Sequence, residues 1–158
     1  MFMDYKQAVC LNGHQASIDI NINESVDSFC TECGAKLITN CTNCNYPIEG
    51  DWSRSGNGFV DLTHHNVPIP KYCEKCGKPY PWTQSALKAI SETVNLSELD
   101  NNQKDDLKET IPDLLSDTPK SKLAVLKWKS IGKSLLPYIH DIIVEVASES
   151  IVKALYGR

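Results

Sequence analysis

Long apolar runs are scarce in the first half of this 158-residue chain. Residues 1–82 contain little core material, although they hold all seven cysteines and three of the four histidines. A segment of that composition buries too little apolar surface to fold alone, so it needs disulfide bonds or bound metal ions to stabilise it. From residue 83 onward cysteine is missing, and the chain is rich in leucine, isoleucine and lysine. This change in composition predicts two domains, residues 1–82 and 83–158.

The sequence also lacks the features of export and of membrane insertion. Its start, MFMDYKQAVC, has no basic segment followed by an apolar one, as a secretory signal would. No uncharged apolar stretch approaches the roughly 18 residues of a membrane-spanning helix. We therefore expect a cytoplasmic protein with no membrane partner, where thiols stay reduced. An odd number of cysteines also fits a disulfide framework poorly.

Motifs of the common enzyme classes are missing as well. The chain has no glycine-rich phosphate loop, nucleophile elbow, HExxH sequence or metal-dependent nuclease motif. The acidic residues of the second half lie near expected helix starts, where they act as caps and dipole partners. We expect no enzymatic activity.

The cysteines that are present form a regular pattern, with one single residue and three CxxC pairs: Cys10, Cys30/Cys33, Cys41/Cys44 and Cys73/Cys76. The stretch CLNGH adds His14 four residues after Cys10 and so supplies an eighth ligand. Eight ligands complete two tetrahedral zinc sites. We predict two zinc ions per chain, and they are structural because four protein ligands leave no open position for a substrate.

The residues that follow the cysteine pairs are those that a tight metal-binding turn requires. Gly34 and Gly77 come directly after two of the pairs, and Gly13 precedes His14. Glycine permits the positive φ that closes such a turn. Asn45, after the remaining pair, is the next-best residue for a left-handed conformation. A redox role would need a CxxC pair that binds no metal. Because two complete zinc sites use all three pairs, none is left for such a role.

The order in which the pairs combine has two readings. Sequential pairing joins the first four ligands in one site and the last four in the other, whereas cross-braced pairing interleaves them. The stretch ASIDINI alternates apolar and polar residues from Ala16 to Ile22, which predicts a strand. A strand that leads from one ligand pair towards the next is the geometry of a zinc ribbon, so sequential pairing is favoured.

The stretch FCTECGAKLITNCTNC resembles the junction of tandem zinc ribbons, where one ribbon's second ligand pair runs into the next ribbon's first. With CLNGH before it and YCEKCGKPYPWT after it, the chain resembles a family of uncharacterised bacterial zinc-ribbon proteins, a domain of unknown function. The resemblance covers most of the chain and implies no activity. The expected fold is a small zinc-stabilised β half, a tandem zinc ribbon, followed by an all-α half of three to four helices.

The segment between Cys44 and Cys73 is long for a ribbon and contains Trp52, Arg54 and Phe59. Exposed aromatic residues with an arginine are typical of a recognition surface, so these three are candidate partner-binding residues. The alternative reading places Trp52 and Phe59 in the small ribbon core.

Helix signals organise the second half. We expect helices that start at Thr83, near Ser97 and at Thr118, the second ending before Pro112. A final helix runs from Pro137 to about Tyr156, and its apolar residues span about half of its circumference. That breadth indicates either that the helix lies centrally among the other helices or that it buries part of its apolar arc against another subunit. Because only three or four short helices accompany it, we favour self-association through Ile143 and Ile151, hence a homo-oligomer.

Charge decides between the function classes. Residues 1–82 carry six Lys and Arg against nine Asp and Glu, and bound zinc thiolates make the segment more acidic still. Because phosphate contacts dominate nucleic-acid affinity, this charge disfavours DNA or RNA as a partner. The sequence favours a zinc-binding, non-enzymatic adaptor or scaffold of a bacterial cytoplasm that binds a protein partner. The alternative is a nucleic-acid-binding or regulatory zinc-ribbon protein that uses a lysine stripe at Lys122, Lys129 and Lys133.

Overall fold

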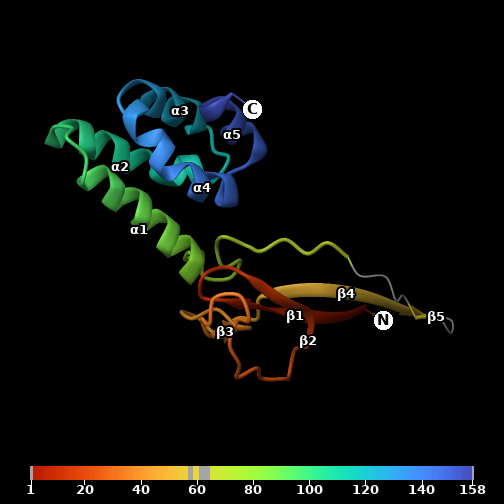
Figure 1. Ribbon diagram of the computed structural model, residues 1–158. Helices are drawn as coiled ribbons and strands as arrows, with labels where there is room; N and C mark the ends of the chain where they lie inside the picture. The colour runs from red at the N-terminus through yellow and green to blue at the C-terminus, as the bar shows by residue number, and fades with distance from the viewer. Residues whose placement is uncertain (1, 57–58, 61–64, 158) are drawn as a thin grey trace. The chain divides into compact units, whose positions relative to one another are not determined.

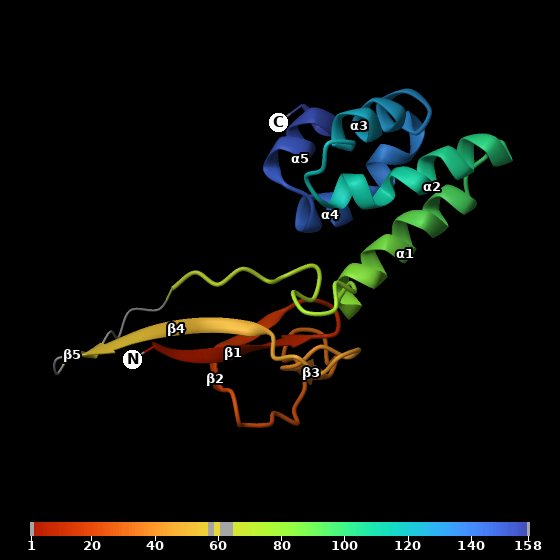
Figure 2. The same cartoon turned by 180° about the vertical axis from the view of Figure 1, so that it is seen from behind.

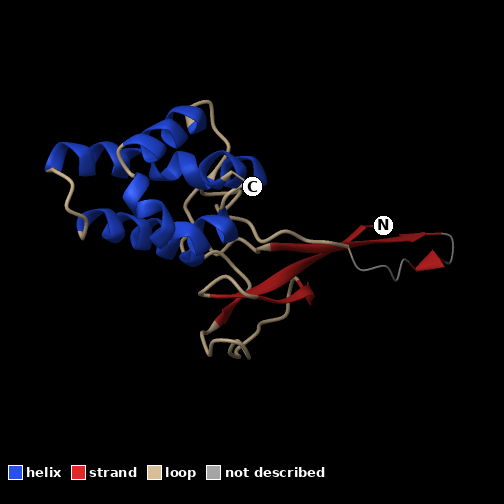
Figure 3. Cartoon of the chain, turned by 45° about the horizontal axis from the view of Figure 1, so that its top comes forward, coloured by secondary structure: helices blue, strands red, loops and turns tan. Residues whose placement is uncertain are grey.

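The computed structural model describes the backbone of residues 2–56, 59–60 and 65–157, and the side chains of residues 5–52 and 65–157. The chain forms two compact units, Met1–Gln84 and Ser85–Arg158, which we call the sheet unit and the helical unit. The division lies two residues beyond the boundary expected from composition. All described strands belong to the sheet unit, whereas helices make up the helical unit (Figure 3). None of the described helices has the length and apolar character needed to cross a bilayer.

The sheet unit is built around its first strand. Strand β1 (Phe2–Cys10) pairs antiparallel with β2 (Gln15–Asn21), with β3 (Leu37–Ile38) and with β4 (Glu49–Gly56), and β4 pairs with β5 (Phe59–Val60) (Figure 1). The strand expected from the alternation in ASIDINI is β2, so that prediction is confirmed. The predicted fold class, a small β half with cysteine-rich sites and a helical half, is confirmed as well.

A glycine lets β4 pack closely on the sheet. A Cβ atom at Gly50 would collide with the carbonyl oxygen of Ile18 and would lie 2.6 Å from the carbonyl carbon of Lys6. Both contacts are with backbone, which cannot move aside as a flexible side chain can. Glycine is therefore required at this position.

An extended segment, residues 65–71, runs along the sheet before the last cysteine pair (Figure 2). Two glutamines hold it in place. The fully buried Gln7 donates from Nε2 to the carbonyl oxygens of Glu49 and Pro68, at 2.8 and 3.1 Å. Gln15 donates to the side-chain oxygen of Gln7 and to the carbonyl of Val67. These bonds satisfy polar groups that burial would otherwise leave unpaired.

The segment ends on an aromatic anchor. Trp82 is 8% exposed, stacks on Tyr80 with ring centroids 4.8 Å apart, and donates from Nε1 to the carbonyl oxygen of Pro70 at 2.8 Å. The hydroxyl of Thr83 donates to the carbonyl of Lys71 at 2.7 Å. Thr83 was expected to cap a helix, but α1 (Pro81–Asn95) already begins at Pro81, which is pre-organised for a first helical turn.

The helical unit continues with α2 (Asn101–Leu115), α3 (Ser121–Ser130), the short 3₁₀ helix η1 (Lys133–Leu135), α4 (Leu136–Val146) and α5 (Glu149–Tyr156). Its core surrounds Trp128, which is fully buried and donates from Nε1 to the hydroxyl of Thr110 at 2.9 Å. Leu107, Ile139 and Ile143 are also fully buried in this cluster. The helical unit thus has a larger apolar core than the sheet unit.

Two helix ends differ from the expected ones. The final helix is two helices, because Ala147 is extended and the Ser148 side chain accepts a hydrogen bond from the amide of Ile151 as the N-cap of α5. Helix α2 continues through Pro112, where a break was expected, and burial of Leu114 and Leu115 offsets the lost hydrogen bond.

Two helix starts are also corrected. The N-cap of α2 is Asp100, which forms a capping box with Gln103, rather than a residue near Ser97. Helix α3 starts at Ser121, three residues after Thr118, although the Thr118 hydroxyl still accepts a hydrogen bond from the amide of Lys120 at 3.1 Å while it donates to Asp113 Oδ1 at 2.8 Å.

The burial of Ile143 and Ile151 corrects their expected role. Their exposed fractions are 0% and 3%, because α4 and α5 turn these side chains into the core of their own unit. The wide apolar arc that indicated a second subunit is shared between two short helices that pack on one core. Ile143 is fully enclosed, and Ile151 reaches the surface only where it lines a groove between α3 and α5.

Candidate metal centres

The three CxxC turns share one backbone conformation. In each, the amide of the first cysteine donates to the carbonyl five residues later, and the amide four residues later donates back to the carbonyl of that cysteine. In the first turn these bonds join Cys30 to Ala35 at 2.7 Å and Gly34 to Cys30 at 2.9 Å. The residue that donates back has a positive φ in all three turns: Gly34 (75°), Asn45 (63°) and Gly77 (74°). The conformation expected at these three positions is confirmed.

The turn from Cys10 to His14 also brings two ligands together, but with a different set of backbone hydrogen bonds. The amides of Cys10 and Gly13 bond to the carbonyls of His14 and Cys10, both at 2.9 Å. Gly13 has φ of 92°, and a side chain there would meet Cβ of Trp82 at 3.1 Å. The tight turn places His14 Nδ1 3.4 Å from Cys10 Sγ.

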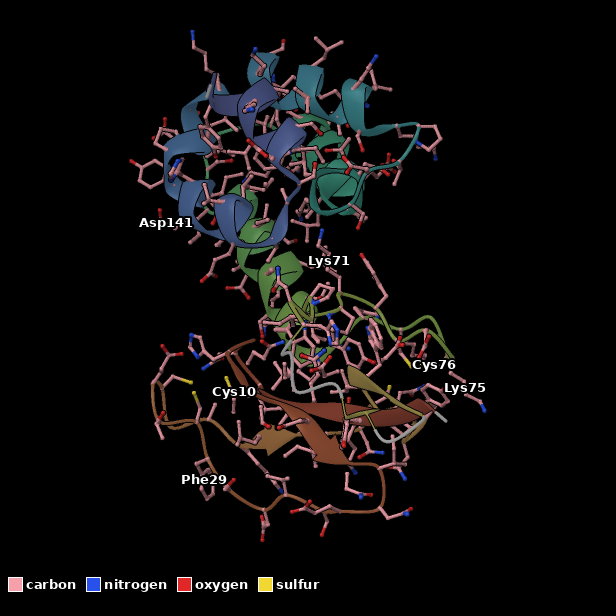
Figure 4. The ribbon with its side chains drawn as sticks, turned by 90° about the vertical axis from the view of Figure 1, so that its right-hand side faces the viewer. Cys10, Phe29, Lys71, Lys75, Cys76 and Asp141 are labelled. Carbon is pink, nitrogen blue, oxygen red and sulfur yellow. The ribbon has the colours of Figure 1, made fainter. Side chains whose placement is uncertain are left out.

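The four turns bring the eight predicted ligands together as two groups: Cys10, His14, Cys30 and Cys33 in the first centre, and Cys41, Cys44, Cys73 and Cys76 in the second. Within each group all ligand atoms lie within 4.8 Å of one another. The grouping is sequential and not cross-braced. Figure 4 shows sulfur atoms gathered beside Cys10 in the first centre.

The distances between ligand atoms match a tetrahedral metal site. Zinc binds sulfur at about 2.3 Å and histidine nitrogen at about 2.0–2.1 Å, so a tetrahedron has edges of about 3.8 Å between sulfurs and about 3.6 Å from sulfur to nitrogen. The Cys41–Cys76 and Cys44–Cys73 Sγ distances are 3.8 and 3.6 Å. Cys10 Sγ lies 3.7 Å from Cys33 Sγ, and Cys30 Sγ lies 3.6 Å from His14 Nδ1.

The donor set narrows the metals that fit. All seven cysteines are free thiols. Neither centre contains an oxygen ligand, which disfavours magnesium and calcium. Four thiolates, or three thiolates with one imidazole, in a tetrahedron suit zinc or iron.

Backbone amides stabilise the thiolate form of several ligands. The amide of Ala35, two residues after Cys33, lowers the pKa of that thiol to about 6, and Asn12 donates to the same sulfur at 3.4 Å. The amide of Cys76 similarly lowers the pKa of Cys73 to about 6. Burial raises the pKa of Cys10. Thiolates that already exist near neutral pH bind a metal with less competition from protons.

The two centres are similarly exposed. In the first, Cys10 and Cys30 are buried, Cys33 is exposed and the His14 side chain is 38% exposed, and the nearby Phe29 is 64% exposed (Figure 4). In the second, Cys41 and Cys73 are buried and pack with Ile48, Tyr80 and Trp82, whereas Cys44 is exposed. Each centre therefore has two buried cysteines and one exposed cysteine.

The candidate partner residues of the sheet unit are only partly described. Trp52 is 39% exposed, and its ring stacks on His65 with centroids 4.1 Å apart. Trp52 is thus neither in the ribbon core nor isolated on the surface. The side chains of Arg54 and Phe59 lie outside the described residues.

A partly buried pair of side chains in this region, His65 and Asp51, was not foreseen from the sequence. His65 Nδ1 lies 2.6 Å from Oδ1 of Asp51, whose side chain is 8% exposed. Although burial opposes it, hydrogen bonds from the amide of Trp52 and from His65 lower the pKa of Asp51. Asp51 lies in β4 and His65 lies 14 residues later in an irregular segment, and no sequence motif links the two. Only the three-dimensional structure identifies this pair.

Comparison with known proteins identifies a family for this chain. Neither a curated protein nor a solved structure matches the chain. A family model matches residues 3–155, which is nearly the whole chain, and its description is "Uncharacterized protein conserved in bacteria (DUF2321)". The resemblance to an uncharacterised bacterial family is thereby confirmed: the chain belongs to this family.

Proposed function

We propose that the protein is a zinc-stabilised interaction module, an adaptor without enzymatic activity, that carries two structural zinc ions per chain. The observation that supports this best is the closure of both centres. Each has four ligand atoms from the protein at tetrahedral spacing. A metal held in this way has no open position at which to activate water or a substrate.

Zinc has a clear structural task in the sheet unit. The two apolar clusters of this unit are small and include metal ligands. One contains Val9, Cys41, Ile48, Cys73, Tyr80 and Trp82, and the other contains Cys10, Cys30 and Leu37. Four of these nine residues are metal ligands. The metals therefore lie inside the core that holds the strands together, and binding them contributes directly to folding.

Cobalt substitution tests whether the sites are closed. Co²⁺ in place of zinc should give the absorption of tetrahedral cobalt thiolates, and added azide should leave that spectrum unchanged because no coordination position is open. A spectrum that shifts when azide is added would reveal an exchangeable ligand, and the structural assignment would then be wrong.

The role as an adaptor requires a partner. We propose a protein partner in the bacterial cytoplasm, because the sheet unit is acidic and repels phosphate. Protein isolated from its own host without chelators should run in native mass spectrometry as a complex with a second protein. A zinc-loaded monomer with nothing bound would argue against the adaptor role.

Nucleic-acid binding is the second candidate, and one observation favours it. Lys122, Lys129 and Lys133 are all exposed. The helical unit as a whole contains ten basic and eleven acidic residues, so these lysines form a local feature and not a basic domain. Retention of DNA or RNA that falls with salt and with loss of these lysines would favour this candidate.

A further inference from the structure

Helix α3 is apolar on two of its sides. Ala124, Val125 and Trp128 face the core and are at most 8% exposed. Leu123 and Leu126, three residues apart on the outer side, are 55% and 64% exposed. A surface helix of a globular protein needs only one apolar stripe. A second stripe of large side chains in contact with water indicates a surface that another molecule covers.

Of these two exposed leucines, Leu126 lines a groove between α3 and α5. The groove has a volume of about 590 Å³ and is lined on α5 by Ser150, Ile151 and Ala154. Val125 and Leu126 line it on α3, so its surface is largely apolar. This volume is in the range of cavities that bind ligands or partner side chains.

Two lysines on α3 also line the groove. Lys122 and Lys129 are seven residues apart, which is two helical turns or about 10 Å along α3, with Leu126 between them. Other lysines of this unit form ion pairs, Lys127 with Asp106 and Lys153 with Glu149, but within the described part of the chain Lys122 and Lys129 form none. Both are exposed and available to an acidic partner.

One acidic residue also lines the groove. Asp117 accepts a hydrogen bond at Oδ1 from the Ser148 hydroxyl at 2.9 Å, and this neutral donor leaves its negative charge in place. The groove is therefore an apolar channel with two positive charges from α3 and one negative charge from Asp117, and its net charge is positive.

We propose that this groove binds an acidic amphipathic helix of a partner protein. Apolar residues at every third or fourth position would fill the channel above Val125 and Ile151, as in other helix-in-groove complexes. Acidic residues one or two turns apart would meet Lys122 and Lys129. A nucleic acid fits less well, because its phosphates would pair with the two lysines but leave the apolar channel between α3 and α5 exposed to water. This proposal rests on the proposed role as an interaction module and specifies its partner.

The test uses the full-length, zinc-loaded protein and a labelled synthetic peptide of about 18 residues, long enough for five helical turns. The peptide carries leucine at every third or fourth position and glutamate on the flanking faces. Fluorescence anisotropy should show saturable binding, and Leu126→Ser should weaken it. Lys122→Glu combined with Lys129→Glu should weaken it on the order of tenfold or more, since two attractive charge pairs become repulsive.

Matched variants separate the groove from general effects. Leu96→Ser removes a leucine that is 87% exposed on a different part of the unit, and it should leave binding unchanged. Lys88→Glu with Lys108→Glu gives the same net charge as the groove variant and should also have little effect. A peptide with lysine in place of each glutamate should bind the groove variant better than it binds the native protein.

Several outcomes would overturn the proposal. These are no saturable binding up to about 1 mM peptide, equal weakening by the groove and control variants, tighter binding of a single-stranded DNA, or dimerisation of the protein through the groove. The proposed function would survive such a result if native mass spectrometry still showed a partner that the groove variant retains. The proposed function would be overturned as well only if native mass spectrometry found no partner.

Discussion

Replacing Ile143 with alanine tests whether this residue belongs to the core of the helical unit or to an interface between subunits. Ile143 is fully buried in α4 within a single chain, so we expect the change to destabilise the isolated monomer. Three carbon groups are lost from the core at about 0.8 kcal/mol each, and the cavity left behind adds to this sum. The expected loss in the free energy of unfolding is about 3 kcal/mol.

The neighbouring residue is a natural control. Val144 follows Ile143 on the same helix but is 48% exposed. Val144→Ala should change stability by no more than about 0.5 kcal/mol. Circular dichroism at a helix-sensitive wavelength follows the helical unit directly. For a unit of this size the Ile143→Ala variant should lower Tm by about 12–24 °C.

Protein concentration distinguishes the two readings. If Ile143 packs within its own chain, the Tm of native protein and variant should be the same at about 5 and about 100 µM, because only association makes Tm depend on concentration. A Tm that rises with concentration in the native protein but not in the variant would refute this reasoning. So would a loss below about 1 kcal/mol for Ile143→Ala.

Three further predictions concern the sheet unit. Gly50→Ala should unfold this unit or lower its free energy of unfolding by well over about 2 kcal/mol, because the new Cβ meets backbone atoms. Unchanged tryptophan fluorescence and zinc content would contradict this. Because each centre has two buried cysteines and one exposed cysteine, a zinc chelator should remove both metals at similar rates, and two widely separated phases would count against this. Asp51→Asn should destabilise the unit at pH 7. Since the folded pKa of Asp51 is lowered, its contribution exists above its unfolded pKa of about 4 and is lost as pH falls through the folded value. The difference in stability between native and variant protein should therefore shrink on acidification, and a constant difference would contradict the role of the pair.

The turns around the cysteines were predictable because their chemistry is local. A cysteine pair, its spacing and the glycine or asparagine after it lie within five consecutive residues, and the positive φ at Asn45 follows from the same local pattern. The grouping of the eight ligands follows from the strand between the first two turns.

The features that were missed depend on contacts between distant residues. The break at Ser148 competes with a continuous helix, and the side chain of Asp117, 31 residues away, helps to fix it by accepting a hydrogen bond from that serine. The Asp51–His65 pair joins a strand to an irregular segment. The burial of Ile143 reflects two short helices packing on one core. None of these contacts leaves a periodic signal in the sequence.

The most direct test of the central claim is the metal content and folding of the purified protein measured together by native mass spectrometry. We expect two zinc ions per chain and the low charge states of a compact protein. Once both ions are removed, the sheet unit should unfold and the chain should shift to higher charge states. A chain that holds fewer than two metal ions, or that keeps the same compact state and protease resistance after their removal, would contradict a structural role for these centres.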